Sequence, residues 1–416
     1  MNKHERIAQY AYEKSLFYRE NIEYTESKES ENVEFEKLPI VSKDDIVESG
    51  FPISPIEYMM KGNKDAIKVS TSGSTGKILT IDWNKKDFLM SMTPLWNLRR
   101  KYYGINTWDR MCYFYTIRFL GSKEMMETED RNTLGFSKTS LNDERLKEIY
   151  MKMTDYKPKW LLLQPSTAKM LINTALKYEL SPIDTVEYIE FTGEMLTDEL
   201  RRKVKDFFDC KIANQYGSYE FNSIAYECPY GNMHIMSENV YVEVMGEDGI
   251  VHKIGDCNND DESEKDLIIT SLINKRTPFI RYNIGDRGKV TNKIECKCGN
   301  HSPIIKLTVG RSHNYAECED GTRLNAYIFP RAIENVNCVL DDVIKQFQVI
   351  QRGINDFLVR LYVDDMSETN AIKEVFERNI LEEALKNARY EYSFESEYIK
   401  DIKGDKLMYF RKEEMV

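Results

Sequence analysis

The segment 70–77, Ser-Thr-Ser-Gly-Ser-Thr-Gly-Lys, has the composition of a loop that binds phosphate. Its two glycines allow the backbone to turn tightly, so that consecutive N–H groups can point at one anion. The hydroxyl side chains and Lys77 add further donors for phosphate oxygens. The order Gly-x-x-x-x-Gly-Lys-Ser/Thr is missing, which argues against a nucleoside triphosphatase of the Walker type. We interpret the segment as a phosphate-binding loop, with a flexible surface linker of small residues as the alternative.

A second group of residues has the chemistry of a metal site. Cys296 and Cys298 are separated by one residue, and Cys228 and His234 precede them on what we expect to be the same β-rich part of the chain. Three thiolates and one imidazole can close a tetrahedral zinc site. The Cys-x-Cys spacing is tighter than that of a zinc ribbon, so four reduced, partly buried side chains are the alternative. We expect the remaining cysteines to be core or surface residues, namely Cys112, Cys210, Cys257, Cys318 and Cys338.

Short apolar strands alternate with amphipathic helices from about residue 66 onward, and these elements must position both groups. Such alternation favours an α/β sheet with crossover helices. The predicted strands are 67–69, 160–163, 188–191 and 211–213, and the predicted helices are 85–103, 167–178 and 198–208. The phosphate-binding loop would then follow the first strand.

After Cys228 the pattern changes to longer strands of alternating residues, and a further change follows residue 309. We therefore predict an α/β fold with a large N-terminal domain and a small α+β C-terminal domain, and an active site between them. The predicted divisions are a domain over 1–309, a β-rich subdomain at about 228–309, a domain over 310–416, and within the last a helix over 368–386.

The composition excludes several classes of protein. Hydrophobic residues make up 41% and charged residues 31% of the 416 residues, as expected of a globular chain. The net charge of -11 disfavours a nucleic acid as partner, because such binding depends on clustered Lys and Arg. The N-terminus lacks the apolar core of a signal peptide, and no later run is apolar enough for a membrane helix. We therefore predict a cytoplasmic protein with no membrane association.

Four further motifs follow the loop in order. They are 214–220 (Asn-Gln-Tyr-Gly-Ser-Tyr-Glu), 281–286 (Arg-Tyr-Asn-Ile-Gly-Asp), Gly310–Arg311, and 404–407 (Gly-Asp-Lys-Leu). Together with the loop they resemble the motifs of adenylate-forming enzymes, which include acyl-CoA synthetases, peptide-synthetase adenylation domains and luciferases. The resemblance spans nearly the whole chain. It implies a large domain that binds ATP and acid, and a mobile C-terminal lid domain.

Shorter similarities resemble the phenylacetate-CoA ligase branch of that family. They are 11–19, Leu38–Pro39 before Lys43–Asp44, 156–158, 165–166, Gly193–Glu194, 270–282 and the hinge segment with Asp320–Gly321. Ligases of this branch are also similar at the four proposed zinc ligands. The branch implies an aromatic acid as substrate.

The resemblance implies a role for each matching residue. The residues implied in nucleotide binding are Thr71, Ser72, Gly73, Ser74, Thr75, Gly76, Lys77, Gly193, Glu194, Asn214, Tyr216, Gly217 and Asp286. Tyr216 would stack on adenine, and Asp286 would accept hydrogen bonds from the ribose hydroxyls. Glu220 would hold Mg²⁺, and Arg311 would meet phosphate at the hinge. Lys406 would neutralise charge between the carboxylate and the α-phosphate.

The implied reaction joins a small carboxylic acid to AMP and then passes the acyl group to a thiol. The thiol would be coenzyme A or the phosphopantetheine of an acyl carrier protein. Two alternatives stay open. The first is an enzyme with an amine or hydroxyl acceptor, or one that transfers AMP itself. The second is a non-catalytic nucleotide-binding homologue. Tyr219 stands where the family prefers Thr, Ser312–His313–Asn314 replaces an acidic hinge pair, and Asp405 precedes Lys406. Lys403 is a second candidate for the role of Lys406.

Overall fold

The structure is a computed structural model. It describes residues 1–21, 33–61, 66–70, 79–115, 119–120, 123–138, 141, 143–194, 196, 198–246, 248–254, 263–292, 295–307, 315–319, 321–326, 328–340, 343–363, 366–380, 383–395, 399 and 410–413. The chain divides into two compact units. Unit 1 comprises Met1–Val69, Thr80–Met111 and Lys157–Gly310, and unit 2 comprises Ser70–Leu79, Cys112–Tyr156 and Arg311–Val416. The division into domains 1–309 and 310–416 stays a prediction.

One large sheet organises unit 1. Its strands within unit 1 are β8 (Trp160–Leu163), β9 (Tyr188–Thr192), β10 (Lys211–Ser218), β11 (Asn222–Glu227), β12 (Met233–Ile235), β13 (Val240–Met245), β14 (Val251–Lys253), β15 (Lys265–Ser271), β16 (Tyr282–Thr291) and β17 (Ile304–Leu307). The hydrogen-bonded order of these strands is β14-β13-β15-β16-β17-β12-β11-β10-β9-β8. Strands β8, β9 and β10 run parallel, whereas β10 and β11 begin an antiparallel series. The sequence predicts the change from an α/β to a β-rich pattern after Cys228, one strand later than this change of direction.

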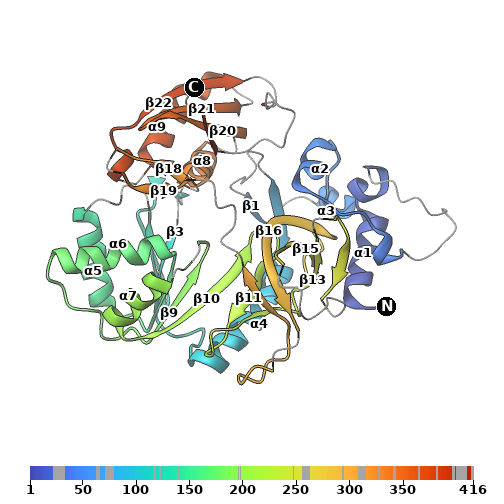
Figure 1. The fold of residues 1–416 in the computed structure, drawn as a ribbon, viewed down its shortest axis with the longest axis horizontal. Helices are drawn as coiled ribbons and strands as arrows, with labels where there is room; N and C mark the ends of the chain where they lie inside the picture. The colour runs from blue at the N-terminus through green and yellow to red at the C-terminus, as the bar shows by residue number, and fades with distance from the viewer. Residues whose placement is uncertain are drawn as a thin grey trace. The chain divides into compact units, whose positions relative to one another are not determined.

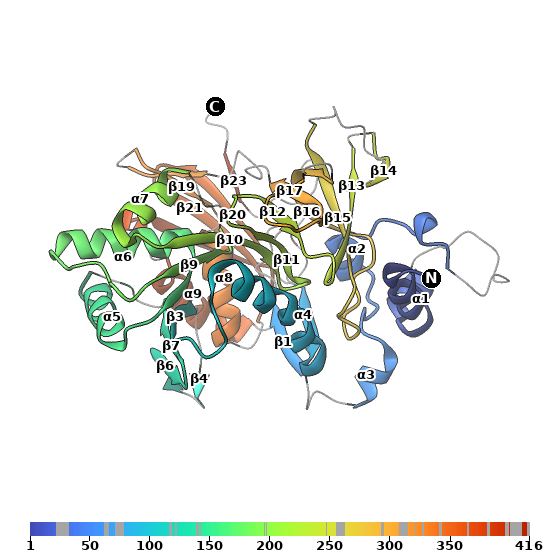
Figure 2. The same ribbon diagram turned by 90° about the horizontal axis from the view of Figure 1, so that it is seen from below.

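Helices cover both faces of the parallel strands. Helix α4 (Lys85–Leu98) continues into the π-helical turn η3 (Arg99–Tyr103) on one face, where Leu95 and Tyr103 pack against Trp160, Tyr188 and Ala213. Helices α6 (Pro165–Lys177) and α7 (Asp198–Phe208) lie on the opposite face (Figure 2). A separate pair, β1 (Ala66–Ser70) and β2 (Thr80–Asn84), precedes α4.

The N-terminal segment packs against the antiparallel part of the sheet. Its helices are α1 (Lys3–Lys14), η1 (Phe17–Asn21), η2 (Phe35–Lys37), α2 (Lys43–Glu48) and α3 (Ile56–Lys61). Helix α1 buries Ile7, Ala8 and Ala11 and lies beside β13 and β15 (Figure 1). The buried Tyr18 hydroxyl donates to the carbonyl of Pro278 at 2.9 Å and accepts from the Ile280 amide at 3.0 Å. The segment 11–19 is therefore tied to the chain that leads into β16.

Unit 2 contains two groups of elements. The first group comprises β3 (Met111–Tyr115), β4 (Phe119–Leu120), β5 (Lys123–Glu124), β6 (Glu127–Asp130), β7 (Thr133–Ser137) and α5 (Asp143–Tyr156). The second group comprises β18 (Tyr315–Glu317), β19 (Arg323–Asn325), α8 (Ile328–Val339), β20 (Ile344–Gly353), β21 (Asp356–Val363), η4 (Met366–Glu368), α9 (Thr369–Arg378), η5 (Glu383–Leu385), β22 (Arg389–Glu395) and β23 (Phe410–Lys412). The C-terminal strands form a sheet in the order β22-β21-β20-β23.

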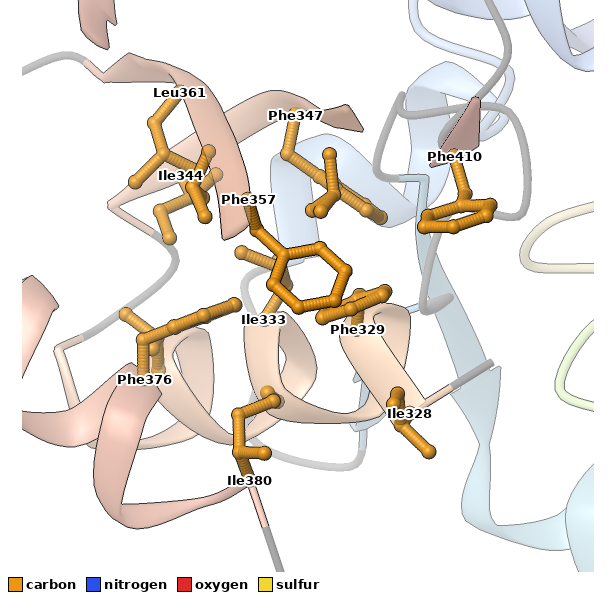
Figure 3. Packing of buried hydrophobic residues seen from close by; sticks show 14 of the residues in the cluster. Ile328, Phe329, Ile333, Ile344, Phe347, Phe357, Leu361, Phe376, Ile380 and Phe410 are labelled. Carbon is orange, nitrogen blue, oxygen red and sulfur yellow. The ribbon is translucent and has the colours of Figure 1, made fainter. Parts of the chain in front are cut away.

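Aromatic residues fill the core of this C-terminal α/β part. Phe329 of α8 stacks against Phe410 of β23 and packs on Phe357 of β21, with ring centroids 5.5 Å and 5.2 Å apart (Figure 3). Ile333 and Phe376 extend the same cluster. This part therefore has its own hydrophobic core, as the prediction of a small α+β domain requires.

The predicted helix over 368–386 is wrong in its length, because α9 ends at Arg378. The buried Asn379 explains the end of the helix. Its side-chain amide donates to the carbonyl of Val375 at 2.6 Å, and its side-chain oxygen accepts from Asn335 of α8 at 2.7 Å. A side chain that satisfies a carbonyl of the last turn competes with continuation of the helix. No helix that the structure describes is long and apolar enough to cross a membrane.

Candidate functional site

The hairpin between β10 and β11 presents Tyr216 and Glu220. The register of this pair shifts between Tyr216 and Gly217, which is a β-bulge. A Cβ atom on Gly217 would lie 2.2 Å from the carbonyl oxygen of Asn222, so only glycine permits this close approach. Bulges redirect side chains beside functional sites. The close approach of the Asn222 backbone thus explains why the 214–220 motif has a glycine at 217.

The motif 281–286 is held by Arg281. Its buried guanidinium pairs with Glu243 of β13 at 3.1 Å and 3.2 Å. It also donates to the carbonyls of Glu36, at 2.9 Å, and Leu38. Arg281 has a positive φ of 45°, which a non-glycine residue adopts only when its surroundings enforce it. This arginine therefore connects the N-terminal segment to β13 and β16.

The two motifs meet at Tyr216 and Asp286. The Tyr216 hydroxyl donates to Asp286 Oδ2 at 2.7 Å. Burial, followed by the charge of Asp286, raises the pKa of Tyr216 well above its ordinary value. The phenol therefore remains protonated and acts as donor to the carboxylate. Asn283 supports the turn before Asp286, because its side-chain oxygen accepts from the Gly285 amide at 2.9 Å.

Glu220 is a buried carboxyl group, 7% exposed, at the end of the same hairpin. Burial raises its pKa above the ordinary value, and the charge of Asp286 adds to that effect, whereas Lys43 lowers it. The neighbouring Tyr219 carbonyl accepts from the Trp83 indole at 2.9 Å, and the Tyr219 side chain is 45% exposed. The charges of Asp286 and Lys43 thus both act on Glu220. The carboxylate oxygens of Glu220 and Asp286 are of the type that a divalent cation prefers.

Sequence reasoning gave Lys43 no role at the site. Val41 bridges to Tyr282 in parallel register, accepts from the Asn283 amide at 2.8 Å and donates to the Arg281 carbonyl at 3.0 Å. Ser42 then caps α2, which begins at Lys43. The cation consequently starts a helix beside the 281–286 motif. The only signal in the sequence was the similarity of Leu38–Pro39 and Lys43–Asp44 to one branch of a family.

Gly193 and Glu194 follow the end of β9, and Asn214 lies in the middle of the neighbouring strand β10. Gly193 follows β9 with a φ of +80°, a conformation that favours glycine. Thr192 pairs with Gln215 of β10, so Gly193 leaves the sheet beside Tyr216. The Asn214 amide donates to the Glu227 carboxylate at 2.7 Å. The other predicted nucleotide-binding residues, 71–77, and the predicted catalytic residues Arg311 and Lys406 lie outside the described residues.

The four predicted metal ligands come together between β11, β12 and the loop before β17. The ligand atoms of Cys228, His234, Cys296 and Cys298 all lie within 4.8 Å of one another. Cys228 Sγ lies 3.6 Å from Cys296 Sγ, and Cys298 Sγ lies 3.3 Å from His234 Nε2. A tetrahedral zinc ion with thiolates at 2.3 Å separates two sulfurs by about 3.8 Å. The donor set and its spacing therefore fit zinc.

Neighbouring groups set the protonation of the residues in this cysteine–histidine cluster, and this determines which atoms can bind a cation. His234 Nδ1 lies 3.0 Å from the Ser302 carbonyl, an acceptor, so Nδ1 carries the proton and Nε2 keeps its lone pair. Burial raises the pKa of Cys228 to about 12. Burial also opposes ionisation of Cys296, but hydrogen bonds led by the Cys298 amide and Asn232 lower its pKa to about 6. Asn232 donates to Cys296 Sγ at 3.2 Å.

Comparison with known proteins identifies the fold. No family model matches the sequence. Protein CapK of Staphylococcus aureus is 24% identical over 352 residues, which cover 82% of this chain and 72% of CapK. A structure of 2-hydroxyisobutyryl-CoA ligase, in complex with 2-HIB-AMP and CoA in the thioesterification state, aligns with a TM-score of 0.63 and 16% identity over 99% of this chain and 88% of the ligase. The same ligase in the postadenylation state, with R3-HIB-AMP, has a TM-score of 0.60 at the same identity and coverage.

This is the adenylate-forming ligase fold. The predicted fold class is confirmed by the alignment over nearly the whole chain. Within this ligase fold, β10, β11 and β16 carry the two motifs that meet at Tyr216 and Asp286.

Proposed function

We propose that this protein is an ATP-dependent, AMP-forming carboxylate ligase. A carboxylate oxygen attacks the α-phosphorus of ATP, and the bond to pyrophosphate breaks, which gives an acyl-adenylate. A thiol sulfur then attacks the acyl carbon, the thiol proton is lost to solvent or a base, and AMP leaves. The residues proposed to bind nucleotide and Mg²⁺ are those that the sequence motifs imply, with Lys43 added as a cation beside Glu220.

The hydrogen bond between Tyr216 and Asp286 carries this proposal. It brings together two residues that are 70 positions apart in the chain. Each belongs to a motif that resembles a nucleotide-binding motif of adenylate-forming enzymes. An aromatic ring beside a carboxylate suits a nucleoside, because the ring can stack on a base while the carboxylate accepts from ribose hydroxyls. Glu220 is the proposed magnesium ligand, since carboxylate oxygen is a preferred donor for that hard cation.

The acceptor that we propose is coenzyme A. The fold is shared with a ligase whose structures contain 2-HIB-AMP and CoA, and this supports a thiol acceptor. The phosphopantetheine of an acyl carrier protein has the same thiol chemistry and is the second acceptor to test. We further propose an aromatic acid as substrate, on the resemblance of segments such as 11–19 and 270–282 to phenylacetate-CoA ligases.

The same proposal includes one structural zinc ion in the cysteine–histidine cluster. Three thiolates and one imidazole leave no open coordination position in a tetrahedral site, so zinc would stabilise the fold and take no part in the reaction. The fit of the sulfur spacing and the proton on His234 Nδ1 support zinc.

Pyrophosphate exchange tests the first half of the reaction without knowledge of the acceptor. The purified protein is incubated with ATP, Mg²⁺ and radiolabelled pyrophosphate across a panel of aromatic, hydroxy and aliphatic carboxylic acids. We expect exchange that requires both Mg²⁺ and one class of acid, and that is lost in Asp286→Ala. Nucleotide binding without exchange for any acid would favour the non-catalytic homologue.

The acceptor is then tested with the acid that supports exchange. Thioester formation is compared for coenzyme A, a phosphopantetheinylated carrier protein, and amine acceptors such as hydroxylamine. Thioester formation with coenzyme A is the expected result. Product formation with amines alone would contradict the proposed thiol acceptor, while exchange would still support adenylate formation.

A further inference from the structure

Glu227 occupies the position between the cysteine–histidine cluster and the strand β10. It is the last residue of β11, and Cys228 follows it directly in the chain. Glu227 is 6% exposed, although it belongs to none of the nucleotide motifs. A carboxylate is rarely buried without a specific partner, so its contacts indicate what it does.

The carboxylate of Glu227 replaces a rung of the β10–β11 ladder. Residue pairing along these strands reaches Gln215 and Tyr226, and the next pair would be Asn214 and Glu227. There the Glu227 Oε2 atom accepts from the Asn214 amide at 2.7 Å and from Arg201 of α7 at 2.8 Å. A charge-assisted bond to a backbone amide is stronger than the neutral bond that it replaces. Asn214 lies two residues before Tyr216 on the same strand.

The backbone of Glu227 faces the turn η3, which also contacts the cluster. Its carbonyl accepts from the Tyr103 hydroxyl at 2.8 Å, and the neighbouring Tyr102 hydroxyl donates to Cys298 Sγ at 3.6 Å. Tyr103 is held in place by stacking on Tyr188 of β9, with ring centroids 4.6 Å apart. Glu227 is therefore linked to the cluster twice, through the peptide bond to Cys228 and through two adjacent tyrosines.

We propose that Glu227 is a positioning residue that couples metal binding at the cysteine–histidine cluster to nucleotide binding at β10. A metal ion that joins Cys228 to the loop of Cys296 and Cys298 restrains the end of β11. Glu227 passes that restraint to the Asn214 amide, and thus to the part of β10 that carries Tyr216. This inference rests on the proposed function, because it takes β10 as a nucleotide-binding strand.

The test is a comparison of AMP affinity in protein loaded with one equivalent of Zn²⁺ and in protein treated with a chelator. Calorimetry measures AMP binding for the wild type, Glu227→Ala, Glu227→Gln and Glu238→Ala, the last being the same change on an exposed turn. We expect zinc to strengthen AMP binding by about tenfold in the wild type and in Glu238→Ala. In Glu227→Ala the affinity should be low with or without zinc, and Glu227→Gln should retain part of the coupling because an amide oxygen can still accept from Asn214.

Hydrogen exchange of the peptide that covers 211–218 gives a second readout, which does not depend on catalysis. Zinc should slow this exchange in the wild type, and the effect should be absent in Glu227→Ala. Equal zinc effects on AMP affinity in all four proteins would overturn the coupling and leave the proposed function intact. A wild type that binds zinc but no AMP would overturn the proposed function as well. Glu227→Gln is nearly isosteric, so it keeps the test decisive if Glu227→Ala does not fold.

Discussion

The Tyr216 hydroxyl donates a hydrogen bond to Asp286, although β17, β12 and β11 lie between their strands, β10 and β16, in the sheet. Neighbouring strands are about 4.8 Å apart, so a flat sheet would separate β10 from β16 by about 19 Å. A contact of 2.7 Å therefore requires the sheet to curl strongly between these strands. The bulge at Gly217 and the positive φ of Gly285 are local features of the two strands that meet. The curvature thus forms the candidate nucleotide site.

Replacement of Asp286 by alanine should weaken nucleotide binding severely. The ribose would lose two charge-assisted hydrogen bonds, each worth about 1.5–3 kcal/mol. Tyr216→Phe removes only the hydroxyl and keeps a ring for stacking, so its effect on AMP affinity should be much smaller. Calorimetry with AMP checks both, and Asp266→Ala, which removes a half-exposed carboxylate on β15, is the matched control. Unchanged affinity in Asp286→Ala would contradict the assignment of this residue.

The sequence correctly predicted the strands of the parallel region, because these depend on local patterns. The strand predicted at 188–191 is β9, and the helix predicted at 85–103 is α4 followed by η3. The role of Arg281 could not be predicted, because its partners Glu243 and Leu38 are distant in the chain. The same limit applies to Asn379, whose buried partner Asn335 belongs to another helix and ends α9 early.

Arg281→Met should lower the stability of the fold by about 3–5 kcal/mol, the usual consequence of leaving a buried charge without its partner. Here that charge is Glu243, which is buried beside Arg281. Arg287→Met on the same strand is the control, since its ion pair with Asp266 is half exposed and should contribute at most about 1 kcal/mol. Urea unfolding followed by circular dichroism measures both. Equal effects of the two variants would mean that Arg281 has no special structural role.

Acidification should weaken the binding of Mg²⁺-ATP through Glu220. Burial raises the pKa of this carboxyl group, so the folded protein takes up its proton at a pH above the ordinary value of 4.5. Below the raised pKa, protonation of Glu220 favours the folded state. Binding of Mg²⁺ has the opposite pH dependence, because it requires the carboxylate form and strengthens as the pH rises through this pKa. The affinity for Mg²⁺-ATP should therefore fall with decreasing pH, and Glu220→Gln should bind weakly with a flatter profile.

The effect of Lys43 on the pH dependence of Mg²⁺-ATP binding provides a further check of the role assigned to Glu220. Lys43 lowers the pKa of Glu220, so Lys43→Ala should move the loss of Mg²⁺-ATP affinity to higher pH. Calorimetric titrations at a series of pH values would detect the shift. A profile identical to that of the wild type would show that Lys43 does not influence Glu220. Neither residue type nor spacing pointed to this pair, because α2 and the β10–β11 hairpin are brought together only by the fold.

Protein purified without chelators should contain about one zinc per chain, as a four-ligand site requires. The double variant Cys296→Ser, Cys298→Ser should lose the metal, because hydroxyls replace two of the three thiolates. Cys210→Ser removes a buried thiol outside the cluster and should retain it. Metal analysis by mass spectrometry gives the stoichiometry. Full occupancy in the double variant would show that the metal lies elsewhere.

The resemblance to adenylate-forming enzymes implies that Lys406 acts only in the first half of the reaction. Lys406→Ala should remove a cation that is needed where negative charge gathers between the carboxylate and the α-phosphate, and pyrophosphate exchange should collapse. Attack of a thiol on a pre-formed acyl-adenylate needs no such cation, so this half-reaction should remain nearly intact. Equal losses in both half-reactions would point to a folding defect or a misplaced lysine. Unchanged rates in both would transfer the role to another cation, and Lys403→Ala, measured in the same two assays, would show whether Lys403 supplies it.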